Sequence, residues 1–115
     1  MSTIKIYWLN WVVVLRPTTD LSSDTEIEEL LEAFKSSWAE CYQGIVINLS
    51  DVHRLSSTAF GALVDCHRLA RGTHTRIAIC CVNPRILRIL DLAGLGSFLN
   101  RFESEADAIR YCRER

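Results

Sequence analysis

The chain has 115 residues, of which 49% are hydrophobic, and its 13 basic and 14 acidic side chains give a formal net charge of −1. This length predicts one domain, residues 1–115, that is large enough to bury a core without disulfide or metal staples. The balanced charge provides no field that would attract nucleic acid or an anionic membrane surface. We therefore expect neither nucleic-acid binding nor direct membrane insertion, and we look for partners in local features.

The five cysteines show none of the two-residue spacings typical of zinc or redox sites. They are Cys41, Cys66, Cys80, Cys81 and Cys112, and we expect small buried side chains in a reducing cytosol. Because Cys80 and Cys81 are adjacent in a predicted strand, they should point to opposite faces and be inert. The first residues do not resemble a signal peptide, and the apolar run 11–15 is shorter than the roughly 20 residues that a membrane span needs. These features predict a cytoplasmic protein.

Two strands are predicted at the beginning of the chain. Residues 3–9 alternate between apolar and polar positions, and residues 11–15 form a more buried run that Pro17 ends. The short link between them predicts an antiparallel hairpin. We expect Trp8 and Trp11 to pack in the core and the hairpin rather than to form a binding platform.

Start signals predict three of the helices. Ser23 and Glu26 form a capping box ahead of an apolar face made by Ile27, Leu30, Leu31, Phe34 and Trp38. Asn83-Pro84 opens another helix, which ends at Gly94 and buries Ile86, Ile89, Leu90 and Ala93. Ser104 caps the last helix, in which Ala108, Ile109 and Cys112 dock and Arg110, Arg113 and Arg115 gather at the C-terminal end. Strands are expected at 75–82 and 97–102.

The segment 44–71 contains the central strand and helix. The apolar residues Ile45, Val46, Ile47 and Leu49 predict a strand buried on both faces. From Ala59 the period changes to that of a helix, with a buried face of Ala59, Ala62, Leu63, Cys66, Leu69 and Ala70. Three hydroxyls, Ser56, Ser57 and Thr58, stand at the junction. Ser57 and Thr58 are explained equally well as helix caps or as a functional site.

Strands alternate with helices in the order β-β-α-β-α-β-α-β-α. This order predicts an α/β fold in which a mixed sheet of about five strands is layered against about four helices. No pattern in the sequence indicates a cofactor or a metal site, and we expect His53 and His67 to be surface side chains because no third ligand shares their spacing.

The segment IVINLSDVHRLSSTAFGAL and the later NPRILRILDLAGL resemble the STAS domain of bacterial anti-sigma factor antagonists. In that family the central strand leads to Asp-Ser-Ser/Thr-Gly at a helix start, and a later helix ends in Leu-x-x-x-Gly-Leu. Here Ser56-Ser57-Thr58-Ala59 occupies the first pattern, with Ser56 in place of Asp and Ala59 in place of Gly. Leu90 to Leu95 supplies the second pattern.

The resemblance implies a regulatory protein-binding module without enzymatic activity. Its partner would be a GHKL-type ATPase that is both an anti-sigma factor and a serine kinase, and phosphorylation would release the complex. Ser57 matches the phosphorylated position, with Ser56 and Thr58 as alternatives. The resemblance leaves open whether the protein is a monomer or a homodimer.

A docking face can be placed from the helical spacing. Ser57, Gly61, Val64 and Arg68 share a stripe opposite the predicted buried face. Together with the loop Asp51 to Leu55, which includes His53 and Arg54, this stripe is the predicted partner-binding surface. We name it the docking face.

Two other functions remain open. Related STAS domains build signalling scaffolds without a phosphorylation switch, or serve as subunits of lipid-transporting ABC systems. Asp51, His53 and Ser57 also contain the residue types of a nucleophilic triad, but no Gly-x-Ser-x-Gly elbow is present. We therefore expect no catalytic residues.

Overall fold

The computed structural model describes residues 3–40, 43–94 and 99–114. The elements are, in chain order, β1 (Ile4–Leu9), β2 (Val12–Pro17), α1 (Asp24–Glu40), β3 (Gly44–Asn48), α2 (Ser57–Ala70), β4 (Arg76–Cys80), α3 (Pro84–Leu92), β5 (Arg101–Phe102) and α4 (Glu105–Arg113). This is the predicted order. None of the helices in the described part of the chain is long and apolar enough to cross a membrane.

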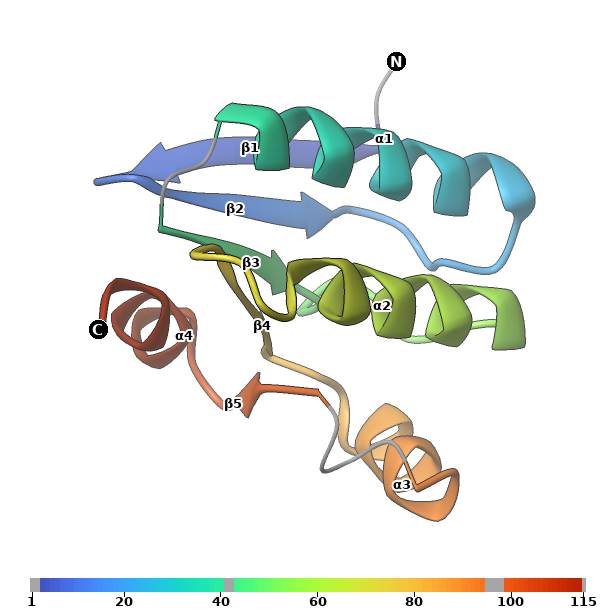
Figure 1. Cartoon of the computed structure of the whole chain (residues 1–115). Helices are drawn as coiled ribbons and strands as arrows, with labels where there is room; N and C mark the ends of the chain where they lie inside the picture. Colours follow the sequence, from blue (N-terminus) through green and yellow to red (C-terminus); the bar gives the residue numbers. More distant parts are fainter. Residues whose placement is uncertain (1–2, 41–42, 95–98, 115) are drawn as a thin grey trace.

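The strands form one five-stranded sheet in the order β1-β2-β3-β4-β5. β1 is antiparallel to β2, as their opposed arrows in Figure 1 show, whereas β2, β3, β4 and β5 run parallel. The parallel strands β3 and β4 are joined through α2, the helical crossover that parallel pairing requires. The predicted mixed α/β sheet is therefore confirmed.

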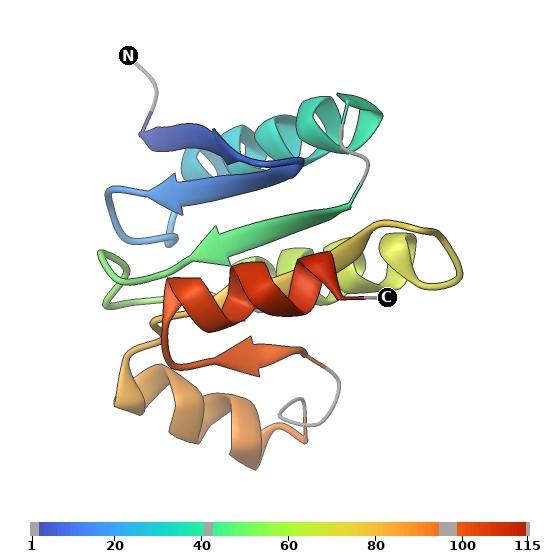
Figure 2. The ribbon, with the colours of Figure 1, turned by 90° about the vertical axis from the view of Figure 1, so that its left-hand side faces the viewer.

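Helices cover both faces of the sheet. α1 and α2 lie behind the sheet in Figure 2, and α4 lies in front of it. The larger apolar cluster contains Phe34, Leu63 and Ile47 and includes Ile86 and Leu90 of α3, whereas Val46, Ala78 and Ile109 belong to a smaller cluster under α4. Because alternate residues of a strand face opposite layers, a central strand that serves both clusters must be apolar throughout, and β3 is buried along its whole length.

The predicted hairpin is confirmed, and its turn explains why the second strand begins one residue later than predicted. Asn10 and Trp11 both have positive φ, 48° and 71°, as a two-residue hairpin turn requires. Trp11 therefore belongs to the turn, where it is 61% exposed, and Trp8 is 43% exposed at the edge of the sheet. Placing these side chains in the core was wrong. The second strand runs from Val12 to Pro17 rather than from 11 to 15.

The later elements agree with the predicted starts but not with every predicted burial. Asn83 caps α3 and Ser104 caps α4 through their side chains, and Gly94 has the positive φ of a helix stop. Ile89 and Ala93 are exposed rather than buried, because α3 packs on the core through Ile86 and Leu90, with Leu87 partly buried beside them. The described strand β5 is limited to two residues, while residues 97 and 98 of the predicted strand, Leu95 of the family pattern and Arg115 lie outside the described residues.

The cysteine prediction is confirmed for the burial of Cys66, Cys80 and Cys112 and wrong for the orientation of Cys81. Cys66, Cys80 and Cys112 are buried, whereas Cys81 is half-buried; Cys41 lies outside the described residues. Cys80 belongs to the cluster under α4, and Cys81 packs against the same cluster. The reason is that β4 ends at Cys80 and Cys81 has a left-handed backbone, with φ of 60°, so the alternation of a strand no longer applies.

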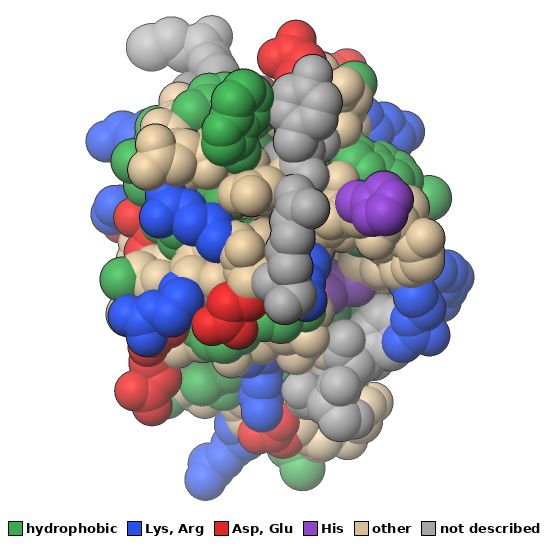
Figure 3. Space-filling view, turned by 60° about the vertical axis from the view of Figure 1, so that its left-hand side comes forward, with side chains coloured by type: hydrophobic (Ala, Val, Ile, Leu, Met, Phe, Trp, Pro, Cys, Tyr) green, Lys and Arg blue, Asp and Glu red, His purple; other side chains and the backbone are tan. Residues whose placement is uncertain are grey.

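Charged side chains of both signs are interspersed on the surface that carries the hairpin tip (Figure 3). No single sign fills this face, in keeping with the net charge of −1.

Candidate functional site

The predicted loop follows β3 at the carboxyl edge of the parallel strands. Backbone hydrogen bonds tie it to the segment that precedes α1: the N–H of Leu21 donates to the carbonyl of Arg54 at 3.1 Å, and the N–H of Ser56 donates to the carbonyl of Leu21 at 3.0 Å. Val52 is buried beneath the loop. Crevices at this edge of α/β sheets are the usual location of binding sites.

One carboxylate fixes the middle of the loop. Oδ1 of Asp20 accepts hydrogen bonds from the backbone N–H of His53 at 2.8 Å and of Arg54 at 3.2 Å. The side chains of His53 and Arg54 are exposed, as expected for His53. A rigid backbone thus presents two nitrogen-bearing side chains to solvent.

Asp51 holds the beginning of the loop against the end of β2. Nε of Arg16 donates to Oδ2 of Asp51 at 3.0 Å, and both side chains are little more than one-third exposed. The hydrogen bond from Arg16 lowers the pKa of Asp51 below its ordinary value. Asp51 is therefore an ionised anchor of the loop.

Ser56 is the cap of the central helix. Its hydroxyl accepts a hydrogen bond from the N–H of Ala59 at 3.2 Å, and its extended backbone lies outside the helix. Ser57 is the first residue of α2, and both Ser57 and Thr58 are exposed. The explanation of Ser57 and Thr58 as caps is wrong, because Ser56 performs that role.

The predicted stripe lies on the surface of α2. Gly61 and Arg68 are exposed, and a Cβ added to Gly61 would meet no atom within 4 Å. Val64 is half-buried against the larger core cluster rather than fully exposed. The prediction that Leu69 lies on the buried face is wrong, because its side chain is 47% exposed. The exposed positions of the predicted docking face are His53, Arg54, Ser57, Gly61 and Arg68, whereas Val52 of the same loop is buried and does not belong to a surface.

The residues proposed for a catalytic triad are not joined to one another. No hydrogen bond joins the side chains of Asp51, His53 and Ser57, and the carboxylate of Asp51 is engaged by Arg16 instead. Within residues 3–40, 43–94 and 99–114, no cluster of three or more His, Cys, Asp or Glu side chains could hold a metal ion.

Placing His67 at the surface was wrong, because its side chain is only 7% exposed. It lies near the C-terminal end of α2 and lines a polar cavity with Arg71 and Arg76. The sequence contained no signal for this cavity, since its residues come from different elements and share no spacing.

Comparison with known proteins gives the same fold. The family model of the STAS domain matches residues 5–108. A protein named anti-sigma F factor antagonist, from Paenibacillus polymyxa, is 22% identical over 98 residues, which are 85% of this chain and 84% of that protein.

Two solved structures are similar over nearly their whole length. The crystal structure of an anti-sigma factor antagonist from Mycobacterium paratuberculosis has a TM-score of 0.84 and 22% identity, covering 97% of this chain and 94% of that one. The Bacillus cell fate determinant SpoIIAA in its phosphorylated form has a TM-score of 0.71 and 17% identity, covering 96% of this chain and 99% of that one. With a family model that matches most of its length, this chain belongs to the STAS domain family.

Proposed function

We propose that this protein is a regulatory binding module that acts as an anti-sigma factor antagonist and is switched by phosphorylation of Ser57. The observation that supports the proposal is that Ser56 and Ser57 have different roles at the start of α2. Ser56 caps the helix, so the neighbouring Ser57 is exposed and has no structural task there. The proteins named as anti-sigma factor antagonists that share this fold support the proposal.

The departure from the family pattern at residue 56 is compatible with the switch. Serine and aspartate are about equally good N-cap residues, and Ser56 makes the capping bond to Ala59. Ala59 is 1% exposed and packs in the larger core cluster, so its methyl group does not reach the docking face. Neither substitution changes the exposure of Ser57.

The position of Ser57 determines what a phosphate would do. At the first residue of a helix, the free backbone N–H groups and the helix dipole favour an anion, so phosphorylation should leave the domain folded. Its effect then falls on the partner, because about 1.5 to 2 negative charges are added to a close-packed contact. We propose a partner of the GHKL type, a combined anti-sigma factor and serine kinase, in the cytoplasm.

The proposal is tested by incubating the protein with such an ATPase and ATP and mapping phosphate by mass spectrometry. We expect phosphate on Ser57, and none on Ser57→Ala, while Thr58→Ala is still modified. Phosphate on Ser56 or Thr58 instead would move the switch by one residue. A stable complex without phosphate on any of the three hydroxyls would contradict the switch and favour a scaffold or a lipid-transport ABC subunit.

A further inference from the structure

Connected polar side chains lie at the carboxyl edge of the parallel strands, next to the loop 51–55 of the docking face, which we call the docking loop. Asn48 is the last residue of β3, and only 4% of it is exposed. Val46 of the same strand packs in the cluster under α4, so Asn48, two residues later, points to the same face. A buried side-chain amide needs hydrogen-bond partners, and those of Asn48 come from two directions.

The side chain of Asn48 connects α4 to the docking loop. Its Nδ2 donates to Oε1 of Glu105 at 2.9 Å, and its Oδ1 accepts a hydrogen bond from the backbone N–H of Ser50 at 2.9 Å. Glu105 is the first residue of α4, and Ser50 immediately precedes the docking loop. One side chain therefore links the start of a helix to the backbone at the start of the loop.

Glu105 reaches the docking loop by a second route, through β1 and β2. The hydroxyl of Tyr7 in β1 donates to the same Oε1. Burial and this contact raise the pKa of Tyr7 to about 12, so the hydroxyl keeps its proton at neutral pH and remains a donor. Arg16 of β2 lies close enough to interact with the Tyr7 hydroxyl, and its Nε donates to Oδ2 of Asp51 at 3.0 Å.

These contacts form one polar network, which consists of Tyr7, Arg16, Asn48, Asp51 and Glu105. The network holds two consecutive residues, Ser50 through its backbone N–H and Asp51 through its carboxylate. Figure 2 shows why α4 takes part: the helix begins on the side where the arrowheads of β2 and β3 end, while its length covers the face of the sheet away from α2. A helix on one face is therefore linked to a loop that leads into the helix on the other face.

The helix dipole alone does not explain the contacts of Glu105. Glu105 and Asp107 both lie in the first turn of α4, where the dipole favours negative charge. Asp107 is exposed and pairs with Arg110 of its own helix, whereas the half-buried Glu105 accepts hydrogen bonds from β1 and β3. Asp107 is therefore a matched control for the charge of Glu105.

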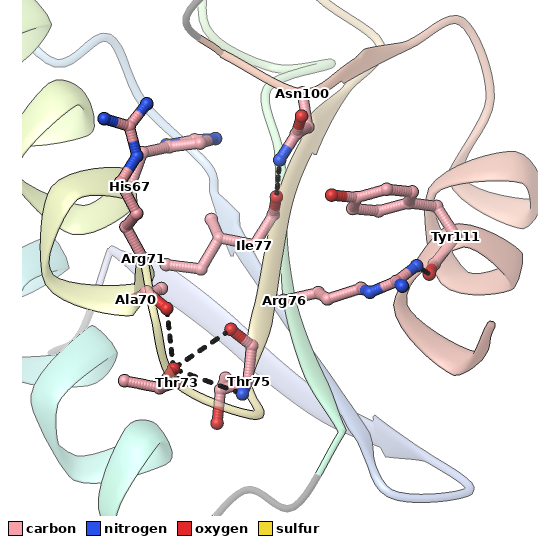
Figure 4. Close-up of a pocket in the computed structure, with 9 residues that line it drawn as sticks. All are labelled: His67, Ala70, Arg71, Thr73, Thr75, Arg76, Ile77, Asn100 and Tyr111. Atoms are coloured by element: carbon pink, nitrogen blue, oxygen red, sulfur yellow. Dashed lines mark hydrogen bonds between the residues drawn. The ribbon is translucent and has the colours of Figure 1, made fainter. Parts of the chain in front are cut away.

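The polar side chains at the other end of β4 provide a second control (Figure 4). There the hydroxyl of Thr73 donates to the carbonyl of Ala70 at 2.6 Å, and the side-chain amide of Asn100 donates to the carbonyl of Ile77 at 3.0 Å. Like Asn48, Asn100 contributes a side-chain amide to the edge of the sheet, but its bond lies at the end away from the docking loop.

We propose that Glu105 and Asn48 are positioning residues of the docking loop, and that partner binding depends on them although α4 lies on the opposite face of the sheet from α2. The part that concerns binding rests on the proposed function. The positioning of the loop is a property of this chain alone, so it can be measured without a partner.

Hydrogen exchange of the full chain labelled with ¹⁵N measures the positioning. Glu105→Ala should accelerate exchange at the N–H groups of Ser50 and Val52 about tenfold, as expected when a stabilising hydrogen bond is lost and the loop opens locally. Asp107→Ala should leave these rates unchanged. The N–H of Thr73, which donates to the carbonyl of Ala70 at the other end of the strands, should keep its rate in both variants.

Binding is measured with a GHKL-type anti-sigma factor. Glu105→Ala and Asn48→Ala should each weaken binding about tenfold, while Asp107→Ala and Asn100→Ala bind as the natural chain does. Glu105→Gln should restore both the affinity and the exchange rates, because its amide oxygen still accepts hydrogen bonds from Tyr7 and Asn48. A merely electrostatic role of Glu105 would not show this rescue.

The outcomes separate this inference from the proposed function. Unchanged loop exchange in Glu105→Ala, equal effects of Glu105→Ala and Asp107→Ala, or faster exchange with unchanged affinity would each overturn the inference and leave the proposed function standing. If the natural chain does not bind the anti-sigma factor, the proposed function fails, and the exchange rates still decide whether Glu105 positions the loop.

Discussion

The hydroxyl of Ser56 accepts a hydrogen bond from the N–H of Ala59 at 3.2 Å, while the adjacent Ser57 is exposed at the first position of α2. Two neighbouring serines thus differ in role. Ser56 stabilises the helix, and Ser57 is available to a partner or a kinase.

Ser56→Ala should lower the free energy of unfolding by about 1 kcal/mol, because the helix loses its N-cap. Ser57→Ala should change it by less than about 0.5 kcal/mol, as expected for an exposed substitution. Urea denaturation of both variants beside the natural protein measures the difference. Equal destabilisation by the two substitutions would show that the cap is shared.

Gly61 and Gly44 should respond in opposite ways to added volume. A Cβ on Gly61 meets open space, so Gly61→Leu should keep or raise the free energy of unfolding by up to about 1 kcal/mol while blocking partner binding. A Cβ on Gly44 would overlap the side chain of Cys112, so Gly44→Ala should destabilise by about 1–3 kcal/mol. Thermal melting and a pull-down with the partner distinguish the two, and a Gly61→Leu variant that still binds would show that the docking face is misplaced.

His67 should make stability depend on pH. Burial lowers its pKa below the ordinary value of 6.5, and the hydrogen bond with the carbonyl of Leu63 opposes this shift only in part. Below pH 6.5 His67 is therefore protonated in the unfolded chain but not in the folded protein. The contribution of His67 to the free energy of unfolding is fully present above this pH. As the pH falls below 6.5, the free energy of unfolding decreases by up to about 1.4 kcal/mol per pH unit.

Chemical denaturation between pH 5 and 8 measures this slope. His67→Gln should flatten it, whereas His53→Gln, a substitution of an exposed histidine, should leave it as in the natural protein. A slope that His67→Gln does not change would mean that His67 has the same pKa in the folded and unfolded states.

The thiol of Cys66 should be inert. Burial raises its pKa to about 12, so almost no thiolate is present at neutral pH to react. Brief treatment of the native protein with iodoacetamide, followed by peptide mapping, should modify the half-buried Cys81 well before Cys66. Faster reaction of Cys66 would show that α2 opens from the sheet.

Local signals were sufficient for most of the fold. The capping box of Ser23 and Glu26 forms as predicted, with hydrogen bonds in both directions. Asn83, Gly94 and Ser104 also mark helix ends as predicted, because a helix cap depends only on residues close to it in the sequence. The exposure of the apolar side chains of Trp8 and Ile89 could not be predicted, because the exposure of a side chain depends on where the covering helices end.

In the candidate site, too, local patterns predicted some features, whereas others depend on contacts between residues far apart in the sequence. The exposed stripe on α2 followed from helical spacing, and only Val64 is more buried than expected. The role of Asp51 as a partner of Arg16 depends on a contact between the end of β2 and a loop that lies 35 residues further along the chain. His67 was misplaced because the cavity wall is completed by α4 and the segment before β5, which no local pattern reports.

The most direct test of the switch is the affinity of a GHKL-type anti-sigma factor for three forms of this protein, measured by calorimetry: the natural chain, Ser57→Asp and Ala106→Asp. The last adds the same charge at the exposed start of α4, on the other face of the sheet. We predict that Ser57→Asp weakens binding about 100-fold or more, a few kcal/mol, with an unchanged melting temperature, and that Ala106→Asp binds as the natural chain does. Equal affinity of all three forms would contradict the account.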